Sequence, residues 1–138
     1  MVKLKAPLGV QELVDAHFDL SVKDPDAWAE LIADDAVWEF PYGRSVGMSE
    51  LQGKAAIVEL VRKFLKPLSD FTYGERTVHI LSEGSAVAEF TSQGIVRENQ
   101  RIYANTYVLF LETADGKITR LREYFDPHAI AHAFAENG

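Results

Sequence analysis

Cysteine is absent from this sequence of 138 residues. The chain can therefore form no disulfide, no thiolate metal site and no cysteine nucleophile, a composition that fits a cytoplasmic protein. It also lacks any run of about 18 apolar residues that would span a membrane, and its first segment, MVKLKAPLGVQ, has no apolar signal-peptide core. We expect a protein of the cytoplasm with no membrane partner.

Basic residues are also in deficit. Fourteen Lys and Arg stand against 21 Asp and Glu, which gives a net charge of −7. A protein that binds a duplex usually presents a basic face, so nucleic acid is not an expected partner. The sequence has no glycine-rich phosphate loop, no dinucleotide fingerprint and no serine elbow, so we expect no cofactor.

What the sequence does have is an ordinary apolar content of 47%, enough for one domain spanning residues 1–138. Helical periodicity, with Asp24 and Asp126 as N-caps, predicts helices at residues 8–22, 25–33, 54–65 and 127–135. β-Branched and aromatic runs predict strands at residues 36–40, 71–81 and 86–96, followed by a long hairpin. Residues 42–52 have no clear period, and we expect a loop there, over the mouth of a pocket.

The hairpin from Ile102 to Pro127 is the strongest local prediction. Asp115-Gly116 between apolar runs is typical of a two-residue turn. Beyond the turn, alternation places Glu123 on one face of the strand with Thr119, Leu121 and Phe125. The opposite face carries Ile118, Arg120, Arg122 and Tyr124. On the preceding strand one face carries Tyr103, Asn105, Tyr107, Leu109 and Leu111. An unpaired carboxylate or amide facing an apolar interior would cost several kcal/mol, so Glu123 and Asn105 are either partnered or kept for chemistry.

Helices near the start of the chain and antiparallel strands after them indicate an α+β fold with the helices on one sheet face. A strongly curved sheet of this kind forms a cone whose concave face is available for a pocket.

Four strings resemble the nuclear-transport-factor-2-like superfamily, in its SnoaL-like and ketosteroid-isomerase-like branch. They are ADDAVWEFP at 33–41, LQGKAAI at 51–57, ANTY at 104–107 and DGKITRLREYFDP at 115–127. The last string is most similar to the phenazine-biosynthesis A/B group. The resemblance covers nearly the whole chain and implies a cystatin-like α+β barrel with a curved, mixed-edge antiparallel sheet. It is weak for the reaction, since the superfamily hosts isomerases, cyclases, hydratases and proteins without known chemistry.

The resemblance also assigns roles to positions. The isomerases carry a carboxylate base just before the proline of the first strand, where this chain has Phe40. Proton transfer needs a titratable group, so steroid isomerisation by that mechanism is not expected. The two oxyanion donors of the isomerases fall near His17 and Tyr107. The acid of the phenazine-biosynthesis group matches Glu123.

The predicted catalytic residues are Glu123, Asn105 and His17. Glu123 is either a pocket acid or base, or the partner of an inward arginine, or exposed if the strand register is off by one. Asn105 either orients a substrate carbonyl or bonds Glu123 or the backbone. His17 is either a satisfied core residue or a pocket donor.

Aromatic residues are predicted to bind substrate, and Trp38, Phe40 and Tyr107 would wall a slot for a flat hydrophobic ligand. The full set is Trp38, Phe40, Tyr42, Tyr73 and Tyr107. His128 and His132 are four residues apart, but no third ligand is suggested, so a solvated helix face is favoured over a metal site. Capping or solvent exposure is likewise the favoured interpretation of Asp34 and Asp35.

Three functions remain open at this stage. The first is a cofactor-free isomerase, cyclase or dehydratase acting on a small hydrophobic cyclic or polyketide-like substrate by acid–base chemistry. The second is a binding protein that uses the same cone without chemistry. The third is an interaction module that pairs through its outer sheet face, and a homodimer is expected under all three.

Overall fold

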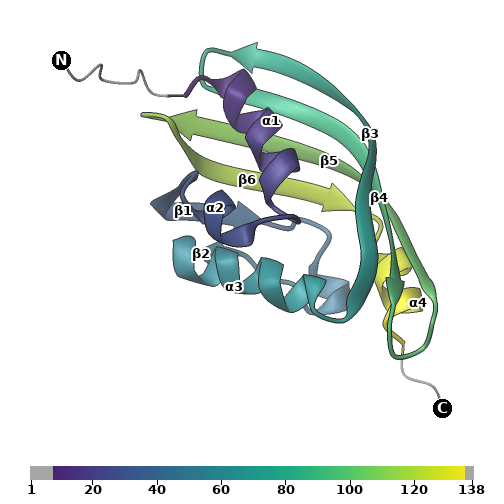
Figure 1. The fold of residues 1–138 in the computed structure, drawn as a ribbon. Helices are drawn as coiled ribbons and strands as arrows, with labels where there is room; N and C mark the ends of the chain where they lie inside the picture. Colours follow the sequence, from purple (N-terminus) through teal and green to yellow (C-terminus); the bar gives the residue numbers. More distant parts are fainter. Residues whose placement is uncertain (1–7, 136–138) are drawn as a thin grey trace.

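A six-stranded sheet dominates the computed structural model, which describes residues 8–135 (Figure 1). The strands lie in the order β2 (Leu51–Gln52), β1 (Ile32–Glu39), β6 (Lys117–Phe125), β5 (Ile102–Ala114), β4 (Ser85–Val96) and β3 (Leu68–Ser82). β1 and β6 are parallel, and all other neighbours are antiparallel. The predicted α+β fold with a curved, mixed sheet is confirmed. The two edge strands do not meet, so the sheet stays open.

Helices α1 (Val10–Leu20), α2 (Pro25–Ala29) and α3 (Lys54–Leu65) lie on one side of the curved sheet, and α4 (Pro127–Ala133) follows β6 (Figure 1). α1 turns one stripe toward the sheet and buries Val10, Leu13, Val14, His17 and Phe18. The predicted caps are present: Asp24 accepts a hydrogen bond from the Ala27 amide at 3.1 Å, and Asp126 accepts one from the His128 amide at 2.9 Å. The predicted bounds of α3 match the structure.

The junction between α2 and β1 differs from the prediction. The helix ends at Ala29 rather than Ala33, and β1 begins at Ile32 rather than Ala36. Ile32 is fully buried and pairs with Ile118, an interaction that no local pattern encodes. Asp34 and Asp35 consequently lie within a strand, where both are exposed. The short strand β2 also interrupts the segment that we expected to be a loop.

The β5–β6 hairpin is confirmed, with one correction. Asp115 and Gly116 have φ values of 52° and 76°, the left-handed pair that a tight hairpin turn requires. In β6, Arg120 pairs with Glu112 while Ile118 pairs with Thr113, so Thr119 is an extra residue that forms a bulge. Ile118 therefore joins Leu121 in the core, instead of lying with Arg120 as simple alternation predicted.

The core fills the space between the helices and the sheet. Phe18 of α1 contacts the rings of Tyr73 and Phe90 edge-on, and Phe90 stacks on Tyr107 with 4.7 Å between ring centroids. Along residues 8–135, the structure has no helix of the length and apolarity needed to cross a bilayer.

Candidate functional site

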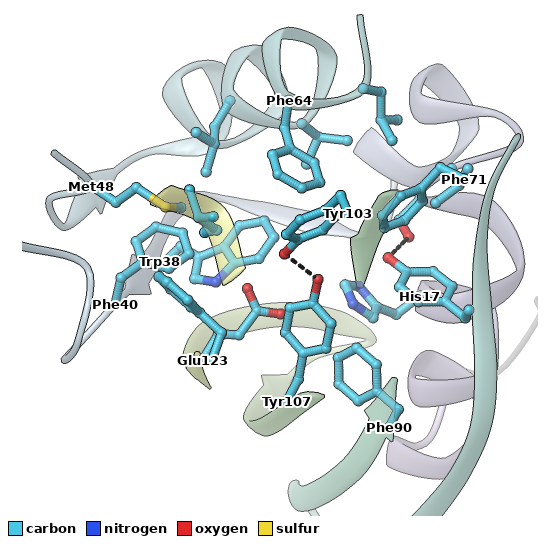
Figure 2. Close-up of a pocket in the computed structure, with 18 residues that line it drawn as sticks. His17, Trp38, Phe40, Met48, Phe64, Phe71, Phe90, Tyr103, Tyr107 and Glu123 are labelled. Atoms are coloured by element: carbon cyan, nitrogen blue, oxygen red, sulfur yellow. Dashed lines mark hydrogen bonds between the residues drawn. The ribbon is translucent and has the colours of Figure 1, made fainter. Parts of the chain in front are cut away.

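A cavity of about 80 Å³ lies where the helices meet the sheet (Figure 2). Its wall is mostly aromatic and includes Trp38, Phe40, Phe64, Phe71, Phe90 and Phe125. A volume of this size holds several water molecules or a small ligand. Met48, from the segment after β1, also lines the cavity, so that segment does border the site as expected.

Glu123 of β6 borders this cavity and points its carboxyl group into it (Figure 2). The strand register places Glu123 opposite Leu109 of β5. On the other side of β6, Glu39 of the parallel strand β1 pairs with Arg122, so the residues that follow them, Phe40 and Glu123, also lie side by side. Within the described chain its carboxyl group has no hydrogen-bond or ion-pair partner. Burial raises the pKa of Glu123 to about 8. At neutral pH it is therefore mostly a protonated acid, with the carboxylate form close in energy.

A chain of hydrogen bonds runs through the tyrosines of β5. The Tyr103 and Tyr107 hydroxyl oxygens are 2.8 Å apart, and Tyr107 is 2.7 Å from Ser92 Oγ. The curvature of the sheet brings together these side chains from the same strand face. Burial raises the pKa of Tyr103 to about 12 and that of Tyr107 further, so both hydroxyls keep their protons. Both tyrosines line the cavity beside Glu123.

Asn105 supports this chain from behind. Its amide nitrogen donates to the Tyr103 hydroxyl at 2.8 Å and to the Asp126 carbonyl at 3.1 Å. Its carbonyl oxygen accepts from the backbone amides of Thr106 and Asp126 at 2.8 and 2.9 Å. Asn105 is thus satisfied by backbone and Tyr103, does not line the cavity, and orients a residue that does.

His17 is held in one tautomer. The indole N–H of Trp28 donates to His17 Nδ1 at 3.0 Å, and because an indole nitrogen only donates, Nδ1 carries no proton. Burial, with a smaller effect of Arg76, lowers the pKa of His17 to about 4. The ring is neutral at pH 7, carries its proton on Nε2 and lines the cavity as a donor.

The predicted aromatic residues divide into two groups. Trp38, Phe40, Tyr73 and Tyr107 line the cavity. Tyr73 shares a hydrogen bond of 3.0 Å with Ser21, and burial raises its pKa to about 12. Tyr42 lies elsewhere: its side chain is 60% exposed and packs edge-on against Tyr124. The structure therefore does not bring Tyr42 to the site.

Several site residues escaped prediction from the sequence. Tyr103, Ser92 and Trp28 act through hydrogen bonds that join different strands or helices, and sequence spacing carries no signal for such contacts. Alternation along β5 puts Tyr103 on the face of Tyr107, and this is the signal that the sequence offers. Across residues 8–135, no three His, Asp or Glu side chains are arranged to hold a metal ion, and His128 and His132 are exposed.

This arrangement places one titratable acid against several fixed proton donors in an apolar space. Such a site is suited to moving a proton on a small uncharged molecule while donors bind an oxygen that gains negative charge.

Comparison with known proteins gives consistent matches. A family model described as "SnoaL-like domain" matches residues 10–121. The protein YesE of Bacillus subtilis strain 168 is 34% identical over 113 residues, which cover 81% of this chain and 77% of YesE.

Solved structures agree with the sequence matches. A Bacillus subtilis protein provisionally named an isomerase has a TM-score of 0.81 and 30% identity, covering 92% of this chain and 93% of that one. A phenazine biosynthesis-related protein of Pseudomonas aeruginosa has a TM-score of 0.77 and 20% identity. The match covers 93% of this chain and 86% of that one. A Catenulispora acidiphila protein with a ketosteroid isomerase-like fold has a TM-score of 0.74 and 15% identity. The match covers 88% of this chain and 91% of that one. The last two matches bear on the fold alone.

Proposed function

Because the chain belongs to the SnoaL-like family, we propose that it is a cofactor-free enzyme of isomerase, cyclase or dehydratase type. Its substrate would be a small, uncharged, cyclic or polyketide-like carbonyl compound. The observation that carries this proposal is Glu123, whose carboxyl group has no partner among residues 8–135 and points into an apolar cavity. The name of the Bacillus subtilis neighbour, provisionally an isomerase, agrees with it.

Glu123 would serve as the proton carrier. Its carboxylate takes a proton from the carbon next to the substrate carbonyl, and the C–H electron pair moves to form an enolate. The neutral Glu123 then returns the same proton to the enolate at another carbon or at the original one, so no proton is gained or lost overall. A pKa of about 8 suits both steps, since neither form of the acid is strongly favoured near neutral pH.

Neutral donors would hold the enolate oxygen. The hydroxyl groups of Tyr103 and Tyr107 and the Nε2–H of His17 line the same cavity as Glu123. All three keep their protons at pH 7. Because the two tyrosine hydroxyls are hydrogen-bonded to each other, the pair offers one free O–H, that of Tyr103 when the donors run from Ser92 through Tyr107 to Tyr103. This O–H and the Nε2–H of His17 are the preorganised donors for a developing negative charge.

The test is exchange of carbon-bound hydrogen for deuterium, followed by proton NMR in D₂O. Small cyclic ketones such as cyclohexanone and 3-cyclohexen-1-one would be incubated with the wild type and with Glu123→Gln. We expect the wild type to accelerate exchange, with a rate that rises with pH to a plateau above about 8 as the carboxylate forms. Glu123→Gln should lose roughly 10²–10⁴-fold of this rate with a nearly unchanged melting temperature.

Full exchange activity in a strongly destabilised Glu123→Gln variant would contradict the proposal, because Glu123 would then be structural. A second function, ligand binding without chemistry, is favoured by Phe40, which occupies the position of the isomerase base. Retention of a ketone by the wild type with no exchange, and equal retention by Glu123→Gln, would support binding alone.

We also propose that the protein is a cytoplasmic homodimer that pairs through the outer face of its sheet. Val87, Val108, Phe110 and Tyr124 are neighbours on this face and only half-buried. A second copy would cover this apolar surface.

A further inference from the structure

Among residues 8–135, the cavity has an indole donor and a carboxyl acceptor that lack a partner, and the two are complementary. Trp38 Nε1 is buried and has no hydrogen-bond acceptor within the described part of the chain. An indole nitrogen only donates, and leaving a buried donor unpaired costs about 1–3 kcal/mol. Glu123, in its ionised form, is an acceptor without a donor among residues 8–135. Both residues line the same cavity.

The sheet places these two side chains next to each other. In the parallel pairing of β1 with β6, Trp38 lies opposite Leu121, and Glu123 is two residues further along β6 on the same face. Side chains in this diagonal relation start about 7–8 Å apart, within reach of an indole and a glutamate. Figure 2 shows the indole nitrogen on the edge of the Trp38 ring that is turned toward the Glu123 carboxyl group.

The indole ring is held in place while the glutamate is free to turn. Trp38 stacks on Phe40 with 5.3 Å between ring centroids and contacts Trp28 at 6.2 Å. Its side chain is 6% exposed. No residue from 8 to 135 forms a hydrogen bond that fixes the Glu123 carboxyl group, so rotation about its side-chain bonds carries an oxygen toward the indole. The donor is therefore fixed, and the acceptor moves.

We propose that the indole N–H of Trp38 is the internal hydrogen-bond donor to the ionised carboxylate of Glu123, which makes Trp38 a positioning residue. One carboxylate oxygen accepts from Trp38, and the other faces the cavity and the substrate. A protonated carboxyl group is a weaker acceptor than a carboxylate, so the contact weakens when Glu123 takes up its proton. The pairing itself does not depend on catalysis, and only its effect on turnover rests on the proposed function.

Other titratable groups at the cavity do not interfere with a test by pH. Tyr73 of β3 and Tyr103 and Tyr107 of β5 keep their protons to pH 12 or beyond, because burial raises the pKa of each. His17 of α1, which Arg76 also influences, has its pKa lowered to about 4. A titration step near pH 8 at this site therefore belongs to Glu123.

The experiment follows the indole N–H resonances by nitrogen-15 NMR between about pH 6 and pH 9, around the pKa of Glu123. The chain has two tryptophans, so two peaks are expected. The Trp38 peak should move downfield with the midpoint of Glu123 ionisation and should stay fixed in Glu123→Gln. The Trp28 peak, whose acceptor is His17, is the internal control and should stay fixed in both proteins. A Trp38 peak that stays fixed in the wild type overturns the proposal.

Substitution of Trp38 gives a second test, which is decided by the direction in which the pKa of Glu123 changes. Trp38→Phe removes the donor, which should raise the pKa of Glu123 and lower its acid dissociation constant about tenfold. If Trp38 only shields Glu123 from water, the smaller ring should instead lower that pKa. Phe40→Leu, which opens the same wall without removing a donor, is the matched control and should not raise the pKa. The readout is carbon-13 NMR of the labelled carboxyl group, assigned with Glu123→Gln.

These results separate the two proposals. A moving Trp38 peak in a protein without deuterium exchange supports the pairing and rejects the enzyme. Exchange that needs Glu123 together with a fixed Trp38 peak supports the enzyme and rejects the pairing. If Trp38→Phe does not fold, the wild-type and Glu123→Gln titrations alone decide.

Discussion

At the scale of single residues, burial controls the chemistry of the site. The interior disfavours the charged form of any group, so it raises the pKa of the acid Glu123 and lowers the pKa of the base His17. Both side chains are therefore mainly neutral at pH 7, and no arginine lines the cavity to change this. The predicted pairing of Glu123 with an inward arginine is absent among the described residues.

The raised pKa of Glu123 predicts a loss of stability as pH rises. Its pKa is about 8 in the folded protein and takes the ordinary value of 4.5 in the unfolded chain, so between these values the folded protein binds the additional proton. The free energy of unfolding therefore falls with pH in this range and is fully reduced above pH 8. Relative to Glu123→Gln, the wild type should lose roughly 2 kcal/mol between about pH 6.5 and pH 8.5.

Urea denaturation at both pH values measures this difference. The pH range of the measurement begins at 6.5, the ordinary pKa of a histidine, so that His17 does not contribute to the difference. In the unfolded chain His17 takes up a proton only below that pH, and this protonation destabilises the fold as the pH falls toward 4. Equal pH dependence in wild type and Glu123→Gln would mean that Glu123 ionises without cost in the folded state.

At the scale of elements, the segment between β1 and β2 folds tightly around Gly43. The Gly43 carbonyl accepts from the amides of Val46 and Met48 at 3.0 and 2.9 Å, and its amide donates to the Phe40 carbonyl at 2.9 Å. A Cβ atom on Gly43 would lie 2.6 Å from the Met48 carbonyl oxygen and 2.8 Å from Phe40 Cβ. Glycine is required here by this close approach, which holds Met48 at the cavity.

Gly43→Ala should consequently destabilise the protein by about 1–3 kcal/mol and displace Met48 and Phe40 from the cavity wall. Gly47→Ala is the matched control. A Cβ there meets no atom within 4 Å, and only its φ of 76° opposes the change, at a cost of about 1 kcal/mol. Urea denaturation gives the stabilities, and tryptophan fluorescence reports the change near Trp38. A Gly43→Ala variant no weaker than Gly47→Ala, with unchanged fluorescence, would contradict the close-packed loop.

At the scale of the whole molecule, the two faces of the sheet differ in their cover. The inner face is buried under α1, α2 and α3 (Figure 1). On the outer face, Phe110 lies beside Tyr124 with 6.2 Å between ring centroids, and the Arg122 guanidinium lies 4.7 Å from the Phe110 ring centre. Arg122 Nε is buried and has no partner among the residues that the structure describes, so this face combines apolar rings with an unsatisfied donor.

We predict a homodimer formed through this outer face. Size exclusion with light scattering should give twice the chain mass of 15.4 kDa for the wild type and one chain mass for Phe110→Glu. Ala55→Glu adds the same charge at an exposed position of α3 and should remain dimeric. A wild-type mass of a single chain would exclude the dimer.

Local sequence determined a large part of this protein. The Asp115-Gly116 turn, the caps at Asp24 and Asp126, and the bounds of α3 follow from preferences of neighbouring residues. Alternation puts Glu123 on one face with Thr119, Leu121 and Phe125. The structure turns Leu121, Glu123 and Phe125 inward together, but Thr119 forms the bulge and Ile118 takes the core position. The four sequence strings at 33–41, 51–57, 104–107 and 115–127 indicate the SnoaL-like family, and the family match confirms it.

Tertiary structure decided the remainder. The start of β1 at Ile32 and the bulge at Thr119 depend on how β1, β5 and β6 pair, which local periodicity does not encode. Tyr42 is an aromatic residue of the type expected at a binding site, yet it packs against Tyr124 and lies outside the cavity. The neutral state of Glu123 and the tautomer of His17 arise from burial and from Trp28, because the free energy of ionisation depends on surroundings that distant segments supply.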